Sequence, residues 1–222
     1  MSRSTLLVVA AGIVVGVAGG LSLYYSGLIS RRTTEPIRTL SSASPGIQPP
    51  HAKGDINAPV AVEEFADFQC PPCAALHFEL RMIEAKYRPR LRVVFRQFPL
   101  EQIHKNALLA ARAAEAADIQ GHFWEMHDRL YEKQDEWSNA ADARQRFIGY
   151  AQYLRLDLKK FELDLDSEQT AQRVSADYRR GQSIQINSTP TVFANGREVL
   201  VESMTPKGIL RSIEAAFKET GR

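Results

Sequence analysis

The feature that most constrains this chain is a pair of cysteines three positions apart. Cys70 and Cys73 are the only cysteines among 222 residues, and two prolines, Pro71 and Pro72, separate them. A structural disulfide framework uses more cysteines, and a structural zinc site normally needs four ligands. The pair therefore favours redox chemistry, in which a dithiol and a disulfide interconvert.

An apolar segment precedes the pair and an amphipathic segment follows it. Residues 60–66 are short, β-branched and aromatic, which predicts a buried strand. The spacing after the pair predicts a helix over 71–87, because apolar residues recur there on one helical face: Leu76, Leu80, Ile83 and Tyr87. Proline is tolerated in a first helical turn, so Cys70 is expected at the helix N-terminus.

A helix N-terminus changes the chemistry of a thiol. Its unpaired amides and the positive end of the helix dipole favour a thiolate, so we expect the Cys70 pKa to fall below the free value of about 8.5. A stabilised thiolate leaves more readily and stabilises the reduced form, which makes the disulfide a better oxidant. Cys73, one turn deeper, is expected to be the buried resolving partner.

Several segments carry a family resemblance, and they occur in the family's order: EFADFQCPPC at 64–73, FRQFPL at 95–100, NALLAA at 106–111 and INSTPTVFANG at 186–196. Together they resemble the DsbA-like branch of thiol–disulfide oxidoreductases in the thioredoxin superfamily. This resemblance implies an α/β protein with a thioredoxin fold, a central mixed sheet flanked by helices. It also implies an inserted all-helical subdomain at about 101–184.

The resemblance also implies roles for individual residues. Cys70 matches the nucleophile and Cys73 the resolving cysteine of a redox disulfide. Glu64, six positions before Cys70, matches a buried acid that moves protons to and from the deeper thiol, and a buried carboxyl has the raised pKa this needs. The expected substrate-binding positions are Pro71, Pro72, Thr189 and Pro190, the last of which matches the family's cis-proline.

Each of these assignments has an alternative. The two cysteines could form half of a zinc site with His77 as a third ligand. Neighbouring strand residues point to opposite faces, so Glu63 could be buried in place of Glu64. Pro190 could be an ordinary trans proline. The Pro71-Pro72 dipeptide lacks the histidine that the best-known strong oxidant of the family carries, which leaves the redox potential open.

Composition and motifs exclude other classes of function. The 28 basic and 26 acidic residues leave a net charge of +2, which gives no nucleic-acid signal. The sequence has no glycine-rich phosphate loop after a strand and no Gly-x-Ser-x-Gly elbow. The five histidines show no metal-binding spacing. We therefore expect neither a metal nor a cofactor.

Residues 1–30 predict a membrane anchor or a signal segment. No charged side chain occurs from Ser4 to Ser30, and the apolar run is longer than the usual core of a cleaved signal peptide, which is the alternative. The arginines after this segment would place the following domain in the cytoplasm. The single pair of cysteines and the arrangement found in relatives favour a domain outside the cytoplasm instead. We expect a single-pass protein of the bacterial cytoplasmic membrane with a periplasmic or extracytoplasmic domain.

The rest of the chain divides into a flexible stem at 31–53 and one compact domain at 54–222. Strands are expected at 60–66, 91–97, 191–194 and 198–201, the last two joined by an Asn195-Gly196 hairpin turn. Expected helices cover 71–87, 104–118, 122–132, 141–155, 157–163 and 168–183, and a last helix starts at Thr205-Pro206. The stem lacks the mass of a dimerisation domain, so a monomer is expected.

The resulting hypothesis is an oxidoreductase that introduces disulfides into reduced or unfolded extracytoplasmic proteins through Cys70 and Cys73. A membrane partner of the quinone-linked type would reoxidise it. Two alternatives stay open: a reductase of the same fold, and a membrane-tethered chaperone or binding module. The sequence does not report the substrates, the redox direction or whether the N-terminal segment is cleaved.

Overall fold

The computed structural model describes residues 38–200 and 204–221. The predicted membrane segment and residues 31–37 of the predicted stem lie outside the described residues. The chain divides into two units with the boundary after Ile37, and the account below concerns the second unit alone. Within the described ranges, no helix is both long enough and apolar enough to cross a membrane.

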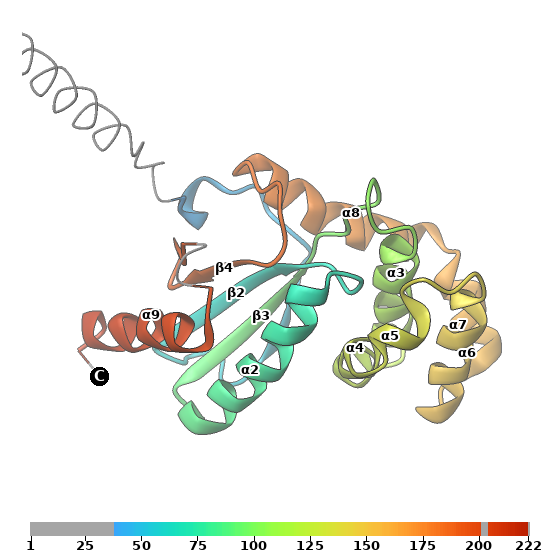
Figure 1. Cartoon of the computed structure of the whole chain (residues 1–222), viewed down its shortest axis with the longest axis horizontal. Coiled ribbons are helices and arrows are strands. Elements are labelled where there is room, and N and C mark those ends of the chain that lie inside the picture. Colours follow the sequence, from blue (N-terminus) through green and yellow to red (C-terminus); the bar gives the residue numbers. More distant parts are fainter. Residues whose placement is uncertain (1–37, 201–203, 222) are drawn as a thin grey trace, which may run out of the picture. The chain divides into compact units, whose positions relative to one another are not determined.

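A five-stranded mixed sheet forms the centre of this unit, in the order β1-β3-β2-β4-β5 (Figure 1). Strand β2 (Val60–Ala66) and strand β3 (Leu91–Gln97) are parallel, and helix α2 (Pro71–Tyr87) connects them. These three elements have the predicted bounds. Strand β1 (His51–Lys53) pairs antiparallel with β3 at one edge of the sheet.

The other edge of the sheet is the predicted hairpin. Strand β4 (Thr191–Ala194) pairs antiparallel with β2, and β5 (Arg197–Glu198) pairs with β4. Asn195 and Gly196 have φ values of 46° and 78°, the left-handed conformation that a tight two-residue turn requires. Strand β5 ends at Glu198, so the described part of the strand predicted at 198–201 is shorter than expected, although the Val199 amide still donates to the Val192 carbonyl at 2.8 Å.

The two faces of the sheet are covered by different helices. Helices α2 and α9 (Pro206–Glu219) share one apolar cluster with the sheet, which includes Leu80, Val93 and Ile213. The Thr205 side chain caps α9 by accepting a hydrogen bond from the Gly208 amide at 3.1 Å. Helix α8 (Glu168–Ser183) covers the opposite face, where a second cluster contains Phe65, Phe98 and Phe193.

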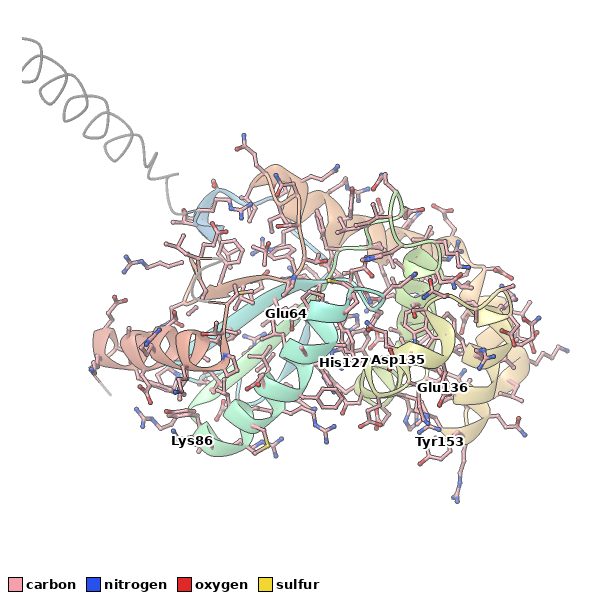
Figure 2. The ribbon with its side chains drawn as sticks, viewed as in Figure 1. Glu64, Lys86, His127, Asp135, Glu136 and Tyr153 are labelled. Atoms are coloured by element: carbon pink, nitrogen blue, oxygen red, sulfur yellow. The ribbon has the colours of Figure 1, made fainter. Side chains whose placement is uncertain are left out.

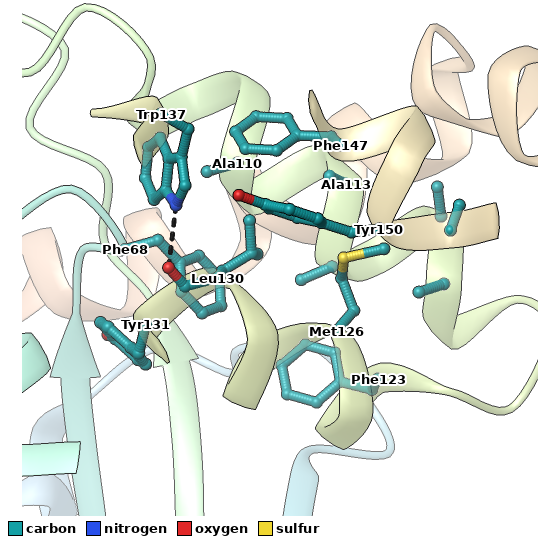
Figure 3. Close-up of a cluster of buried hydrophobic side chains, with 14 of the residues drawn as sticks. Phe68, Ala110, Ala113, Phe123, Met126, Leu130, Tyr131, Trp137, Phe147 and Tyr150 are labelled. Carbon is teal, nitrogen blue, oxygen red and sulfur yellow. Dashed lines mark hydrogen bonds between the residues drawn. The ribbon is translucent and has the colours of Figure 1, made fainter. Parts of the chain in front are cut away.

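The inserted subdomain is helical, as predicted. It contains α3 (Ala107–Asp118), α4 (Phe123–Glu132), α5 (Gln134–Trp137), α6 (Ala143–Tyr153), α7 (Leu158–Leu165) and α8. Buried alanines of α3, including Ala110 and Ala113, let the large side chains of neighbouring helices approach closely (Figure 3). The Trp137 indole N–H donates to the Leu130 carbonyl at 2.8 Å. The sequence did not predict α5, because a single turn is too short to show helical periodicity.

The prediction of a flexible stem is wrong for its described part, residues 38–53. This part contains a short 3₁₀ helix (Leu40–Ser42) and β1, and Ile47 is only 4% exposed. The Ile47 amide donates to Asp177 at 2.8 Å, and Arg38 forms an ion pair with Glu198. Backbone pairing and buried polar contacts hold this segment, and neither leaves a periodic apolar pattern in the sequence.

Candidate active site

The two cysteines lie where β2 passes into α2. Cys70 is the N-cap residue of α2, and Pro71 occupies the first helical position. Cys70 is 5% exposed and Cys73 is fully buried, and both are free thiols in this structure. Pro71 and Pro72 are exposed beside them. The first turn of the helix therefore presents one thiol towards the surface and holds the other in the core.

The pKa of Cys70 is lowered to about 6. The largest cause is a hydrogen bond with the Cys73 thiol, and a hydrogen bond with the Cys73 backbone makes a smaller contribution in the same direction. Burial acts in the opposite sense. The predicted direction of the shift is confirmed, and the hydrogen bonds that lower the pKa come from the Cys73 thiol, from Thr189 and from the Cys73 backbone in the first helical turn.

The pKa of Cys73 is shifted the other way, well above its ordinary value. Burial is the largest cause, and the hydrogen bond to Cys70 and the charge of Glu64 add to it. Their surroundings thus give two chemically identical thiols very different pKa values. Cys70 is a thiolate at neutral pH and Cys73 keeps its proton.

Glu64 lies on β2 beside the start of α2 (Figure 2). It is 3% exposed, and burial raises its pKa to about 8, with a smaller contribution from the charge of Cys70. Its buried Oε1 atom has no hydrogen-bond partner among the described residues. The alternative, Glu63, forms ion pairs with Arg96 and Arg180 instead, at 2.8 Å each. The structure therefore brings Glu64, and not Glu63, to the cysteines.

The loop before β4 faces the outer thiol. The Thr189–Pro190 peptide bond is cis, as predicted. In its protonated form Cys70 donates to the Thr189 carbonyl oxygen, with 3.3 Å between sulfur and oxygen. Thr189 and Pro190 are partly exposed, and so the predicted substrate-binding positions in this loop lie at an accessible edge beside Cys70.

The zinc alternative is not supported by the positions of the side chains. In the part of the chain that the structure describes, no group of three potential ligands within 4.8 Å of one another includes a cysteine. His77, the proposed third ligand, meets His127 and Asp128.

Sequence reasoning missed the residues that hold the active-site loop. Asp67 accepts hydrogen bonds from the amides of Gln69 and Leu100, at 2.7 and 2.8 Å, and its Oδ2 atom lies 2.8 Å from His104 Nδ1. Gln134 of α5 donates to the carbonyl oxygens of Phe68 and Cys70, at 2.7 and 3.1 Å. Asp67 stands next to the cysteine motif and could have been found there. Gln134 has no local signal, since it is 64 positions from Cys70.

Comparisons with known proteins agree with this geometry. A family model described as thioredoxin matches residues 47–215. The chain is 41% identical over 147 residues to the Na(+)/H(+) antiporter NhaA 3 of Salinispora tropica. This match covers 66% of the chain but 22% of the antiporter, so the chain spans less than a quarter of that relative's length.

Two solved structures show the same fold. Oxidised BdbD from Bacillus subtilis has a TM-score of 0.69 and 25% identity, over 80% of this chain and 97% of that one. The α-DsbA1 protein of Wolbachia pipientis has a TM-score of 0.66, with 17% identity over 78% of this chain and 94% of its own. The structural neighbours are DsbA-like oxidoreductases. With the thioredoxin model matching most of its length, the chain belongs to the thioredoxin family.

Proposed function

We propose that the chain is a membrane-tethered thiol–disulfide oxidoreductase that introduces disulfides into extracytoplasmic proteins. The observation that carries this proposal is the opposite shift of two neighbouring thiols. The Cys70 pKa is lowered to about 6, and the Cys73 pKa is raised well above its ordinary value. An outer sulfur that leaves easily and an inner sulfur that stays protonated are what a two-step exchange requires.

The exchange starts from the oxidised Cys70–Cys73 pair. A substrate thiolate attacks the Cys70 sulfur, the Cys70–Cys73 bond breaks, and Cys73 leaves as a thiolate that takes up a proton. A second substrate thiolate then attacks the substrate sulfur of this mixed disulfide and expels Cys70 as a thiolate. The substrate loses two electrons and gains a disulfide, and the protein gains two electrons as the reduced pair.

Glu64 is placed to supply the proton in the first step. Its pKa of about 8 keeps the carboxyl protonated at neutral pH, and once it has given up its proton its charge raises the pKa of Cys73. A carboxyl group that is buried and protonated can therefore donate to Cys73 as the disulfide opens. The partly exposed edge formed by Thr189 and Pro190 would receive the backbone of an extended substrate.

The membrane assignment rests on residues 1–30 and on the kind of relative that the chain matches. The uncharged run from Ser4 to Ser30 is long enough to span a bilayer, and the antiporters are membrane proteins by name. We propose a single-pass anchor in the bacterial cytoplasmic membrane, a domain on the periplasmic side, and a quinone-linked membrane partner that reoxidises the pair. Ion antiport is not proposed, because the chain spans only 22% of the antiporter.

The test compares the two cysteines in the full chain. Cys70→Ser should abolish oxidation of a reduced two-thiol peptide. Cys73→Ser should lose this activity too, because it cannot form the disulfide that accepts the two electrons. Its Cys70 thiolate should still attack oxidised glutathione, release one glutathione thiolate and keep the other glutathione as a stable mixed disulfide, because the internal resolving thiol is gone. Wild-type peptide oxidation by Cys70→Ser would refute the proposal. A fusion of alkaline phosphatase after Arg222 would be active only if the domain lies outside the cytoplasm.

A reductase is the second candidate, and one observation favours it. The Cys70 pKa of about 6 lies closer to the value of about 7 in thioredoxin than to the value of about 3.5 in DsbA. We expect a potential between about −270 mV, the thioredoxin value, and about −120 mV, the DsbA value. Titration of the Cys70–Cys73 pair against glutathione distinguishes the oxidase from the reductase, because a potential near about −270 mV would favour the reductase.

A further inference from the structure

A small cavity with a largely apolar wall lies beside Glu64, between α2 and α4. Its volume is about 30 Å³, enough for one or two water molecules or for a metal ion. Three side chains besides Glu64 bring possible metal ligands to its wall: His77 of α2, and His127 and Asp128 of α4. His127 lies on the side of α4 that faces α2 (Figure 2). Nitrogen and oxygen donors from two helices therefore meet at one side of this cavity.

These three side chains converge. One donor atom from each lies within 4.8 Å of the other two. The Oδ1 atom of Asp128 is 2.9 Å from His127 Nδ1 and 3.9 Å from His77 Nδ1. Zinc–ligand bonds of about 2.0–2.2 Å need neighbouring donors a little over 3 Å apart, so small side-chain movements would complete the site. The sequence hides this group, because His77 and His127 lie far apart in the chain.

The cluster contains donor capacity that the described part of the protein leaves unused. His77 Nε2 is buried and has no hydrogen-bond partner among the described residues, and the whole residue is only 4% exposed.

A second cluster of similar composition differs from this one, because an arginine already pairs with its carboxylates. His51, Glu115 and Asp118 also approach within 4.8 Å. There, Arg173 donates to Glu115 and Asp118 at 2.6 Å each, and His51 Nε2 lies 2.9 Å from Glu115. A protein cation already occupies that position. Among the ion pairs of the described residues, Asp128 has only histidine partners and no lysine or arginine.

Two cations also line the cavity, and both have other contacts. Arg81 forms an ion pair with Glu132 at 3.1 Å, and the Lys53 ammonium lies 5.1 Å from the centre of the Trp124 ring. The same lining contains three carboxyl groups, those of Asp128, Glu84 and Glu64. Glu84 already pairs with Arg88 at 2.6 Å, so Asp128 and Glu64 are the carboxyl groups of the lining that a divalent ion would meet.

We propose that His77, His127 and Asp128 bind a divalent first-row transition-metal ion, with Zn²⁺ as the best match. Two imidazoles and one carboxylate are the ligands of a three-residue zinc site, and they leave a fourth position for water or for the Glu64 carboxyl. The site is separate from the cysteines and does not depend on disulfide exchange.

The experiment uses the full chain with Cys70 and Cys73 oxidised, so that neither thiol can bind metal. Zn²⁺ is titrated by calorimetry, and Co²⁺ is titrated by its visible absorption, with Zn²⁺ as competitor. We expect one equivalent to bind and Asp128→Asn to weaken binding by at least about tenfold. The matched control is His122→Gln, an exposed histidine at the start of the same helix, which should bind like wild type.

Two results would overturn the proposal: no binding by the oxidised wild-type chain, or equal affinity in the wild type and Asp128→Asn. A variant could lose metal binding because it folds poorly, so a second measurement uses the wild-type chain alone. X-ray absorption of the Zn²⁺-loaded oxidised chain should show imidazole and oxygen ligands, and sulfur ligands would contradict the assignment. Because no turnover is involved, failure here leaves the proposed oxidoreductase activity untouched.

Discussion

Glu63 and Glu64 are adjacent residues of the same type on opposite faces of one strand, and the structure treats them in opposite ways. Glu63 accepts from Arg96 and Arg180, and Arg96 in turn donates to the buried Asp177 at 2.9 Å. Among the described residues, Glu64 has no cation in an ion pair, and its Oε1 atom has no hydrogen-bond partner. The Glu63 face is a closed network of charges that ties α8 and residue 47 to the sheet. The Glu64 face holds a single carboxyl group ready to exchange a proton.

The comparison shows why burial alone does not identify a functional acid. A buried carboxylate that is paired stabilises the contacts around it. Removing its partner leaves an unpaired buried charge, whose desolvation penalty then lowers the free energy of unfolding. A buried carboxyl without a partner lowers stability and persists only where its chemistry is used. The distinction lies in the partners and not in the residue type.

The largest expected effect comes from opening the charge network. Arg96→Met removes one of the cations that pair with Glu63 and the cation that pairs with Asp177, so it should lower the free energy of unfolding by about 3–5 kcal/mol. Denaturant unfolding of the full chain measures this. Arg197→Met is the control, because its pair with Glu219 is exposed and should contribute less than about 1 kcal/mol. Equal losses in both variants would show that the network is no more than a surface feature.

The second prediction concerns pH. The Glu64 pKa is raised from 4.5 to about 8 on folding, so between these values the folded state binds more protons than the unfolded state. The free energy of unfolding should therefore fall as the pH rises from about 4.5 to about 8. Glu64→Gln removes this decline, and it should stabilise the chain at pH 8 by on the order of 2 kcal/mol relative to wild type. Parallel stability profiles for the two proteins would show that Glu64 does not titrate in this range.

A smaller effect separates the two sources of the Cys70 shift. Cys73→Ala removes the hydrogen bond that contributes most to the low pKa of Cys70 but leaves the helix N-terminus in place. We expect the Cys70 pKa to rise by about one unit, which is about 1.4 kcal/mol, and to stay below the free value of about 8.5. The rate of alkylation against pH measures it. An unchanged pKa would mean that the Cys73 thiol does not contribute to the shift.

Local sequence was enough for the elements that position the cysteines. The bounds of β2, α2 and β3 follow from runs of apolar residues and from the prolines beside them, and Glu64 and Pro190 follow from the family motifs. Prediction from the sequence failed for features that depend on contacts between residues far apart in the chain. Strand β1 exists because its backbone pairs with β3, and Gln134 reaches the loop through the fold of the inserted helices. The approach of His77 to His127 depends on the packing of α2 against α4.

The central claim is that the protein holds Cys70 as a thiolate and Cys73 as a thiol. The most direct measurement is the alkylation of the reduced full chain across pH, with the modified cysteine identified by mass spectrometry. The account predicts modification of Cys70 alone, with a midpoint near pH 6. A midpoint at or above about 8.5, the value of a free cysteine, or equal modification of both cysteines would contradict it.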